Sequence, residues 1–259
     1  MDLGLEGRSA LVCASSQGLG LACATALARE GCAVFINGRD AGRLATAADA
    51  IRQATGRSVR TVAADINTDA GRAALVAACP DADILVNNNA GPAPGKLEDW
   101  DRAAWTAAIE ANMLAPIFMI RALLPGMRQR RFGRIVNITS AMVKSPSPAM
   151  GLSTACRVAL VALSKSVQRE AVADNVTINN LLPERFDTDR QRFMAERMMQ
   201  QKGISKEQAY ASIVETIAAG RLGTPQEFGD TCAFVCSAQA SFMSGQNIQL
   251  DGGSYKGLM

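Results

Sequence analysis

A glycine-containing turn near the N-terminus carries the clearest chemical signal in the sequence. Residues 14–20, ASSQGLG, follow an apolar run at residues 9–14 and precede an amphipathic stretch at residues 19–30. Between a strand and a helix, such a turn directs backbone N–H groups and the positive end of the helix dipole at a phosphate. Glycine permits the tight turn and the close approach of the ligand. The sequence therefore predicts a nucleotide site, with the pyrophosphate against Ser16, Gln17, Gly18, Leu19 and Gly20.

Histidine is absent from the 259 residues, and tyrosine occurs only twice, as Tyr210 and Tyr255. Without an imidazole there is no Ser–His or Cys–His nucleophile pair, and the commonest metal ligand is missing. The seven cysteines include no C-x-x-C pair. We therefore expect no metal site, and reduced thiols that pack as small apolar side chains. Reduced cysteines and an N-terminus without an apolar signal core predict a soluble, cytoplasmic protein.

Length and charge narrow the functional classes further. A chain of 259 residues with 48% hydrophobic and 20% charged residues is typical of one globular α/β domain. The net charge of +3 is too small for a nucleic-acid footprint. No apolar run reaches the roughly 18 residues of a membrane span. We expect a small-molecule substrate, with no nucleic acid and no membrane as partner.

Short apolar runs alternate with longer amphipathic stretches along the chain. We predict strands at residues 9–14, 32–37, 58–63, 83–86, 134–139, 176–182 and 247–250. We predict helices at residues 19–30, 40–54, 69–78, 97–130 with kinks or breaks at Pro116 and Pro125, 151–173 and 225–237, and two more within 188–220 around Gly203. Apolar strands separated by helices indicate a parallel sheet covered on both faces. The predicted fold class is α/β: one doubly wound Rossmann-type domain over residues 1–259 with a seven-stranded parallel sheet.

The order of the motifs resembles the short-chain dehydrogenase/reductase family over nearly the whole chain. The turn is similar to that family's T-G-x-x-x-G-x-G, with Cys13 and Ala14 at the first two positions. The other matching segments are Asp65-Ile66, residues 87–91 (NNNAG, for the family's N-N-A-G), Asn112, residues 135–140 (IVNITS, ending in Ser140), residues 221–227 (RLGTPQE) and Asp251-Gly252-Gly253. The resemblance implies an NAD(P)-dependent oxidoreductase that interconverts a carbonyl and an alcohol, similar to the 3-oxoacyl reductases.

The same resemblance implies which residues contact the coenzyme. It places Asp65 and Ile66 at the adenine, Pro183 beside the nicotinamide, and Asn88, Ala90 and Gly91 along the coenzyme, although the extra asparagine leaves the register of residues 87–91 open. At the end of the second strand, position 37 holds an asparagine rather than an acidic residue, and Arg39 follows it. This arrangement favours NADP over NAD, because a basic side chain pairs with the 2′-phosphate. NAD remains an alternative coenzyme for two reasons. Arg39 could be a solvated loop residue, and Gln17 stands where relatives that use NADP often carry a basic residue.

The family's catalytic signature is altered in this chain. That signature is a serine, a tyrosine 13 residues later and a lysine four beyond. Ser140 keeps its place, but Ser153 stands at the tyrosine position and Arg157 at the lysine position. With Asn112, these are the predicted catalytic residues. Ser153 and Arg157 share a helix face. Arg157 can hold the nicotinamide ribose, yet it does not release a proton, since its pKa exceeds about 12, and a serine hydroxyl is a weaker acid than a phenol.

Two more departures concern the coenzyme site. Ala14 replaces the first glycine of the turn, which is mild if its φ is negative and costly if it is positive. Glu184 follows Pro183 where relatives have Pro-Gly; it could obstruct the ring, act as a substitute acid if burial raises its pKa, or point to solvent. A water chain, Lys144 or Glu184 could supply the proton. Tyr210 is expected to pack on a helix, and Tyr255 lies near a C-terminus that in tetrameric relatives can approach a neighbouring site.

Three functional interpretations follow. The first is an oxidoreductase with unusual proton delivery. The second is a catalytically silent nucleotide-binding or regulatory protein on the same fold. The third and least favoured is a halohydrin dehalogenase, a group that shares the fold and has arginine at the lysine position but uses the tyrosine and lacks the nucleotide turn. Relatives form dimers and tetramers through the helices at residues 97–130 and 151–173, which implies a homo-oligomer. Residues 185–220 are expected to form a lid-like helical insertion.

Overall fold

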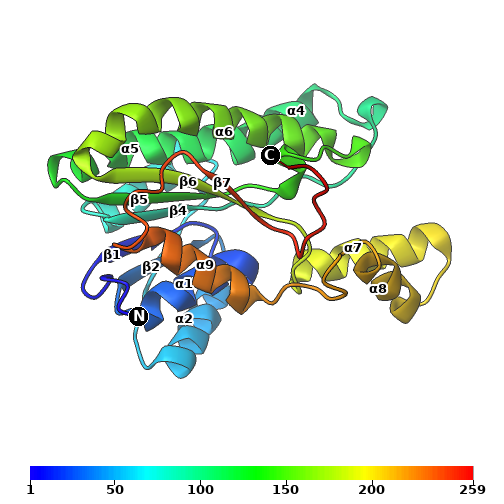
Figure 1. Ribbon diagram of the computed structural model, residues 1–259, viewed down its shortest axis with the longest axis horizontal. Coiled ribbons are helices and arrows are strands. Elements are labelled where there is room, and N and C mark those ends of the chain that lie inside the picture. The colour runs from blue at the N-terminus through cyan, green and yellow to red at the C-terminus, as the bar shows by residue number, and fades with distance from the viewer. Residues whose placement is uncertain (259) are drawn as a thin grey trace.

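Seven parallel strands form one sheet in the order β3-β2-β1-β4-β5-β6-β7 in the computed structural model, which describes residues 1–258 (Figure 1). The strands are β1 (Ser9–Val12), β2 (Ala33–Gly38), β3 (Arg60–Ala63), β4 (Ile84–Asn87), β5 (Gly133–Ile138), β6 (Val176–Pro183) and β7 (Asn247–Leu250). The strand order reverses between β1 and β4. In open α/β sheets, ligands bind outside the carboxyl ends of the strands at such a switch point. The predicted fold class is therefore confirmed, and the topology indicates where the site lies.

Helices cover both faces of this sheet (Figure 1). The helices α1 (Gly18–Arg29), α2 (Ala41–Thr55) and α9 (Pro225–Cys236) lie on one face; α3 (Asp69–Ala78), α5 (Ala115–Gln129) and α6 (Gly151–Ala171) lie on the other; α4 (Arg102–Ile109) packs on α6. The remaining pair, α7 (Asp189–Lys202) and α8 (Lys206–Val214), extends beyond the sheet edge. Gly203 ends α7 in the left-handed conformation with φ +64°, which glycine adopts without strain.

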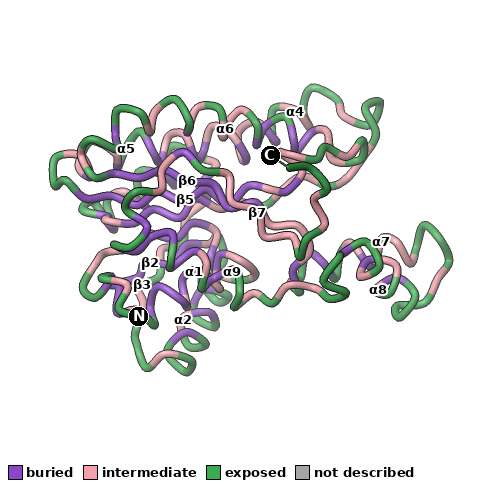
Figure 2. The backbone as a smooth tube through the Cα atoms, viewed as in Figure 1, coloured by how far each residue is buried: buried purple, intermediate pink, exposed green. Residues whose placement is uncertain are grey.

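The core has two halves because the strands are apolar on both faces. Alternate side chains of a strand point to opposite faces of the sheet. In β1, Ala10 and Val12 belong to the core beneath α1 and α9, whereas Leu11 belongs to the core beneath α3, α5 and α6, as does Cys13 just after the strand. Figure 2 shows the resulting band of buried strands between half-exposed helices. The sheet is thus a rigid platform for the loops at its carboxyl edge.

Two helical stretches, Arg102–Gln129 and Pro148–Asp174, are long and apolar enough to cross a membrane by length and composition alone. In each, 39% of the most apolar window is buried inside the protein. Met119, Leu123 and Leu160 from these stretches pack into the core beside the sheet. Core helices of soluble proteins pass the same test, so the two stretches are weak evidence for a membrane span.

The predicted helix at residues 97–130 is interrupted in a way that the sequence only partly indicated. It consists of a short 3-10 turn at Leu97–Asp99, α4, a π-helical segment at Glu110–Leu114, and α5. Pro116 follows the π segment and cannot donate a backbone hydrogen bond to the carbonyl of Asn112, four residues earlier. The interruption therefore falls beside Pro116. Pro125, in contrast, lies within α5 and does not end it.

A ladder of asparagines crosses the sheet near its carboxyl edge. Asn87, Asn137, Asn180 and Asn247 are register partners on β4, β5, β6 and β7. Each side-chain Nδ2 donates to the side-chain Oδ1 of the next asparagine, at 2.9 Å from Asn87 to Asn137, 3.0 Å from Asn137 to Asn180, and 2.9 Å from Asn180 to Asn247. Buried amides connected in this way fix the relative position of the four strands. The loops that follow them start from fixed points.

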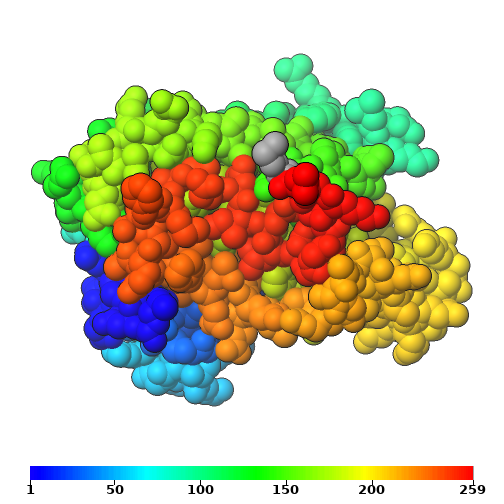
Figure 3. Space-filling model, in the orientation of Figure 1, coloured from blue at the N-terminus to red at the C-terminus, as the bar shows by residue number. Residues whose placement is uncertain are grey.

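The C-terminal segment returns to the carboxyl side of the sheet after β7. Figure 3 shows these last residues, in red, between the green surface of the α4–α6 layer and the yellow lobe formed by α7 and α8. The backbone N–H of Glu184 donates to the carbonyl of Leu250 at 3.2 Å, which ties the end of β6 to the end of β7. Residues 251–258 therefore contribute to the surroundings of the site.

Candidate functional site

The glycine turn after β1 has the geometry of an anion cradle. Gln17 precedes α1 in an extended conformation, and no side chain caps the first turn, so the turn's N–H groups are left for a ligand. Gly18 has φ +59°. A Cβ on Gly20 would lie 2.6 Å from the Ala14 carbonyl oxygen and 2.7 Å from Asn88 Nδ2, so only glycine fits there. These features fit the pyrophosphate of a dinucleotide.

Ala14 adopts the costly one of the two conformations considered from the sequence. Its φ is +44°, in the left-handed region where an L side chain is strained. The surrounding contacts hold it there. Its N–H donates to Asn37 Oδ1 at 3.2 Å, and its carbonyl accepts from Asn88 Nδ2 at 2.9 Å. The two asparagines thus fix the turn that a glycine would adopt without strain.

Ala14→Gly is expected to stabilise the protein. Relief of the left-handed strain is worth about 1–2 kcal/mol, and the extra flexibility of unfolded glycine costs about 0.5–1 kcal/mol. We predict a net gain of about 0.5–1 kcal/mol in the free energy of unfolding. Urea denaturation of the two proteins measures it. A loss of stability in the variant would show that Ala14 is not strained.

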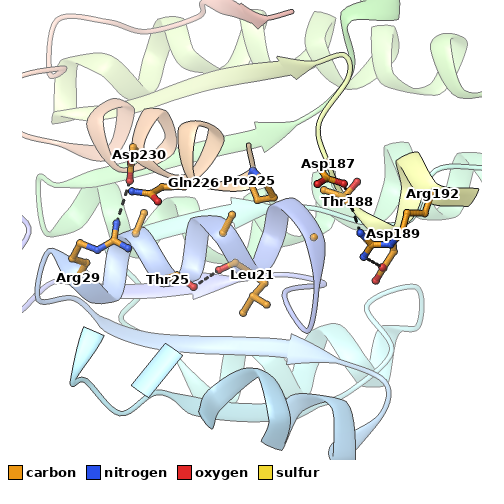
Figure 4. Close-up of a pocket in the computed structure, with 13 residues that line it drawn as sticks. Leu21, Thr25, Arg29, Asp187, Thr188, Asp189, Arg192, Pro225, Gln226 and Asp230 are labelled. Atoms are coloured by element: carbon orange, nitrogen blue, oxygen red, sulfur yellow. Dashed lines mark hydrogen bonds and ion pairs between the residues drawn. The ribbon is translucent and has the colours of Figure 1, made fainter. Parts of the chain in front are cut away.

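A groove of about 380 Å³ runs along α1, α9 and the start of α7 (Figure 4). Gly18 and Thr188 lie at its end near the glycine turn, and the ion pairs Arg29–Asp230 and Arg192–Asp189 lie along its walls. The methyl group of Thr188 is 4.0 Å from the position that a Cβ on Gly18 would occupy. The groove therefore begins at the glycine turn, where the phosphate is expected to bind. Ser140, Ser153 and Arg157 are not among its lining residues.

Basic side chains surround the end of β2. Asn37 is buried and uses its amide within the protein, donating to the carbonyls of Val62 at 3.1 Å and Ala64 at 3.0 Å. No acidic residue therefore occupies the position for ribose hydroxyls. Arg39 is exposed. Arg43, which the sequence analysis missed, donates to Gln17 Oε1 at 3.4 Å across the mouth of the turn. Its spacing of four residues from Arg39 was the available signal.

Asp65 and Ile66, the predicted adenine contacts, present different groups to a ligand. Asp65 is half-buried, and its carboxylate accepts the backbone N–H of Asn67 at 3.0 Å. Ile66 has 5% of its surface exposed and packs into the core, so only its backbone is available to a ligand. Ser16 lies beside Gly38, where a Cβ would be 3.2 Å from the serine Oγ. These residues lie at the carboxyl ends of β1, β2 and β3.

The three asparagines at residues 87–89 have different partners. Asn87 is the last residue of β4 and belongs to the asparagine ladder. Asn88 holds the glycine turn through the Ala14 carbonyl. Asn89 donates to Asn67 Oδ1 at 2.7 Å and to the carbonyl of Ala111 at 3.0 Å, and it accepts the N–H of Ala90. Residues 88–91 therefore follow the end of β4 and lie beside the glycine turn.

Two residues of the altered catalytic signature, Ser153 and Arg157, are hydrogen-bonded to each other. Arg157 Nε donates to Ser153 Oγ at 3.2 Å, and Arg157 Nη1 donates to the carbonyl of Ile138 at 2.8 Å. Ser140 follows β5 two residues after Ile138, and its hydroxyl oxygen accepts the N–H of Met142 at 3.2 Å. Both serine oxygens accept a hydrogen bond, and each hydroxyl also has one O–H group that can donate. The two serines and Arg157 thus lie around the end of β5.

Arg157 is a buried cation without a carboxylate partner. Within residues 1–258 no carboxylate lies within 4.0 Å of its guanidinium. Burial, together with repulsion from Arg190, lowers the pKa of Arg157 to about 10, which corrects the value above about 12 expected from the sequence. A Cβ on Gly91 would lie 3.3 Å from Arg157 Nη2 and 3.9 Å from Ser153 Oγ. The third guanidinium nitrogen therefore faces the segment that follows β4.

Asn112 lies in the π-helical segment, behind Arg157. Its Nδ2 donates to the carbonyls of Ala90 at 3.3 Å and Ala108 at 3.4 Å. A cavity of about 10 Å³ lies between Asn112, Asn87 and Arg157. The side-chain oxygens of both asparagines are buried without a hydrogen-bond partner. A volume of this size holds about one water molecule when polar groups surround it. Asn112 is thus linked to the site through the Ala90 carbonyl and this cavity.

The alternative proton donors lie on the β6–β7 side. Burial raises the pKa of the Glu184 carboxyl, and Asp251 contributes, while Arg185 and Ser254 oppose the shift. Lys144 Nζ lies 5.8 Å from the centre of the Tyr255 ring. Pro183 ends β6 opposite Leu250. Tyr210 lies on α8 and packs against the core of the α7–α8 lobe, as expected from the sequence.

Cysteines provide no additional chemistry in the part of the chain described. All seven are buried free thiols. Burial raises the pKa of the Cys13 and Cys32 thiols to about 12, which suppresses the reactive thiolate. Within residues 1–258, no group of three or more histidine, cysteine, aspartate or glutamate side chains is arranged to hold a metal ion.

Comparison with known proteins places these features in context. The family model described as enoyl-(acyl carrier protein) reductase matches residues 13–255. The NADPH-dependent reductase BacG of Bacillus subtilis (strain 168) is 32% identical over 259 residues, which cover 98% of this chain and 100% of that protein.

Two solved structures are similar over nearly the whole chain. L-sorbose reductase from Gluconobacter frateurii, complexed with NADPH and L-sorbose, is 29% identical, with a TM-score of 0.94 and full coverage of both chains. A 3-oxoacyl (acyl-carrier-protein) reductase from Agrobacterium tumefaciens C58 with NADP bound is 30% identical, with a TM-score of 0.87, and the match covers 97% of this chain and 96% of that one.

Proposed function

The chain belongs to the short-chain dehydrogenase/reductase family, and on that premise we propose that it is an NADPH-dependent reductase of a small carbonyl-containing molecule. The observation that carries the proposal is the cradle formed by Gly18, Gly20 and the uncapped first turn of α1, next to Ser140, Ser153 and Arg157. The two sites lie at neighbouring carboxyl ends of one sheet, as a dinucleotide and a substrate require.

Each part of the chain has a role in this proposal. The first turn of α1 and Thr188 hold the pyrophosphate, while Asp65, the backbone of Ile66 and residues 88–91 line the rest of the coenzyme. The nicotinamide supplies hydride when it is bound. Arg157, Ser153 and Ser140 donate to the substrate oxygen, and Asn112 positions the segment at Ala90. Pro183 flanks the nicotinamide position. The chemistry then depends mainly on orientation and on charge stabilisation at that oxygen.

NADPH rather than NADH is the proposed coenzyme. Arg39 and Arg43 lie just beyond β2, and Asn37 stands at the position for the ribose hydroxyls. The carboxylate of Asp40, between the two arginines, caps α2 by accepting the backbone N–H of Arg43 at 2.8 Å. A 2′-phosphate would pair with the two guanidinium groups, whereas the ribose hydroxyls of NADH would find an amide at Asn37 rather than a carboxylate. BacG and the two similar structures are named for NADPH or NADP.

Removing both arginines is expected to abolish the preference for NADPH. We predict that Arg39→Ala/Arg43→Ala raises the Kd for NADPH about 10- to 100-fold, since each charge-assisted hydrogen bond contributes about 1.5–3 kcal/mol before solvent screening. The Kd for NADH should change less than about threefold. Fluorescence titration of both coenzymes measures the ratio. Equal weakening of NADPH and NADH would contradict the assignment of these residues to the 2′-phosphate.

The test of the proposed function is whether the protein consumes NADPH. Titration first measures binding, and absorbance then follows the coenzyme with a panel of carbonyl compounds, saturated and conjugated. We expect binding and substrate-dependent oxidation. The second candidate, a silent nucleotide-binding protein, is favoured by the loss of both tyrosine and lysine at positions 153 and 157. Binding without oxidation by any member of the panel would support that alternative.

We also propose a homo-oligomer in the cytoplasm. The outer face of α6 exposes 41% of Val158, and Val172 just beyond α6 is also 41% exposed, beside the largely apolar α5. Such faces are commonly buried between subunits. A dimer or tetramer in light scattering, with dissociation caused by Val158→Arg, would agree with this. The α7–α8 lobe is the proposed lid over the substrate.

A further inference from the structure

A second arginine lies close to Arg157, at the start of the α7–α8 lobe. Arg190 is the second residue of α7, and its Nη2 donates to the carbonyl of Pro92 at 2.9 Å. Pro92 directly follows Gly91, where an added Cβ would lie 3.3 Å from Arg157 Nη2. Arg190 also repels the charge of Arg157 and so helps to lower the pKa of that guanidinium. Residues 91–92 therefore connect two cations, one beside Ser153 and one on α7.

Neither of these two arginines has a carboxylate partner in the described part of the chain. The ion pairs within residues 1–258 include neither Arg157 nor Arg190. Asp187 and Asp189, the acidic residues next to Arg190 in the sequence, both pair with Arg192 instead (Figure 4). Cations without a counter-ion raise the free energy of the empty protein, and a bound anion recovers part of that cost.

The two guanidinium groups are suited to different parts of one ligand. Arg157 is buried and belongs to the group proposed to hold the carbonyl oxygen. Arg190 is exposed, with its guanidinium carbon 5.6 Å from the centre of the Phe193 ring, and within residues 1–258 only its Nη2 has a hydrogen-bond acceptor. The remaining N–H groups include one complete edge of the guanidinium fork. Such an edge binds a carboxylate through two parallel hydrogen bonds.

The other charged side chains near the ends of β5 and β6 are mostly positive. Lys144, four residues beyond Ser140, lies 5.8 Å from the centre of the Tyr255 ring. The Nε of Arg185 is buried without a hydrogen-bond partner. Glu184 is the acidic side chain beside Arg185, and its pKa is raised by burial and by Asp251, which favours the neutral carboxyl. An acidic ligand therefore meets a mainly positive environment here.

We propose that the substrate is an oxo acid, a small compound that carries both a carbonyl group and a carboxylate, and that Arg190 binds the carboxylate. This inference rests on the proposed NADPH-dependent reductase and names its substrate class. Arg157, Ser140 and Ser153 then hold the carbonyl oxygen, so the two ends of the substrate are fixed separately. One hydride from NADPH and one proton from water convert the carbonyl into an alcohol. The products are a hydroxy acid and NADP⁺, and the carboxylate itself is unchanged.

Matched acids and esters test the role of the carboxylate. The acids are 2-oxobutanoate, 3-oxobutanoate and 4-oxopentanoate, and each is compared with its own methyl ester, which keeps the carbonyl and loses the charge. NADPH oxidation gives kcat/KM, and calorimetric titration of the complex of protein and NADP⁺ gives Kd. For the best of the three acids we expect a kcat/KM and an affinity about 10- to 100-fold above those of its ester, the scale of one charge-assisted contact.

Arg190→Met should remove the advantage of the acid over its ester. We expect the acid to fall to the level of the ester, mainly through KM, while the values for the ester and the Kd for NADPH change less than about threefold. Arg190→Lys should restore part of the advantage, because an ammonium supplies the charge without the fork. Arg52→Met, which removes an exposed arginine paired with Asp49 on α2, is the matched control and should keep the whole advantage.

The outcomes separate the substrate class from the proposed function. Esters bound and reduced as well as their acids by the wild type would overturn the inference and leave the reductase in place. An acid preference that survives in Arg190→Met would also overturn it, since another cation such as Lys144 would then hold the carboxylate. So would weaker NADPH binding in Arg190→Met, or failure of all three acids to bind. Acids that bind through Arg190 while no carbonyl compound causes NADPH oxidation would support the anion site and contradict the reductase.

Discussion

Arg157→Met is expected to lower kcat/KM about 100- to 1,000-fold while the protein still binds NADPH. Removing one preorganised donor from an oxyanion site costs about 2.7–4 kcal/mol of transition-state stabilisation. Arg157 is buried beside Ser153 and the Ile138 carbonyl, and its side chain is close in volume to methionine. An apolar replacement of similar volume is often neutral or stabilising, so the fold should be retained. Steady-state kinetics, with a thermal melt of the same sample, measures both.

A second variant at position 157 and a surface control on α2 distinguish charge from shape. Arg157→Lys keeps the positive charge, but one ammonium cannot reach both Ser153 and Ile138 in the way a guanidinium fork does. We expect its kcat/KM to lie between those of the wild type and the methionine variant. Arg52→Met removes a surface arginine paired with Asp49 and should leave kinetics unchanged. Wild-type kcat/KM in Arg157→Met would exclude the guanidinium from the reaction.

Gly20→Ala is expected to weaken NADPH binding about 10- to 100-fold. The new Cβ would lie 2.6 Å from the Ala14 carbonyl oxygen, 2.7 Å from Asn88 Nδ2 and 3.0 Å from Ser15 Cα. Two of these atoms are backbone, so the turn itself must move. Overpacking of this kind costs about 1–3 kcal/mol, and each 1.4 kcal/mol lost from binding is about tenfold in Kd. Fluorescence titration with NADPH measures the change.

A matched glycine separates the turn from a general effect of alanine. Gly126 lies within α5, and a Cβ there would meet mainly the end of the flexible Arg130 side chain, at 2.9 Å. Gly126→Ala should leave the Kd for NADPH unchanged and stabilise the helix by up to about 1 kcal/mol. If Gly20→Ala bound NADPH as tightly as Gly126→Ala does, the nucleotide would not lie on this turn.

The sheet and most of the helices could be predicted from local patterns in the sequence. Uniformly apolar strands such as residues 134–139 require cover on both faces, and the glycine turn predicts the first strand–helix junction. The structure agrees on seven parallel strands and on helices on either side of Gly203. These elements depend on local pattern and burial, which is why they could be predicted.

The details of the site depend on contacts between distant segments. The positive φ of Ala14 results from hydrogen bonds to Asn37 and Asn88, 23 and 74 residues away. The side chain of Asn87 is held by Asn137 on the next strand. The pairing of Ser153 with Arg157 was expected from their spacing, but the second contact, with Ile138, could not be read from the helix alone. Arg43 was missed because its partner, Gln17, belongs to another element.

The pH dependence of kcat/KM for the wild-type enzyme tests most directly whether a fixed charge supports the reaction. Burial lowers the pKa of Arg157 to about 10, so the guanidinium is charged below that pH and loses its proton as pH rises through it. We predict a kcat/KM that is constant from about pH 6 to pH 9 and falls near pH 10. If the proton of Glu184 were required instead, activity would be lost as pH rises through that carboxyl's raised pKa. A kcat/KM that falls steadily from about pH 6 upward would contradict the role assigned to Arg157.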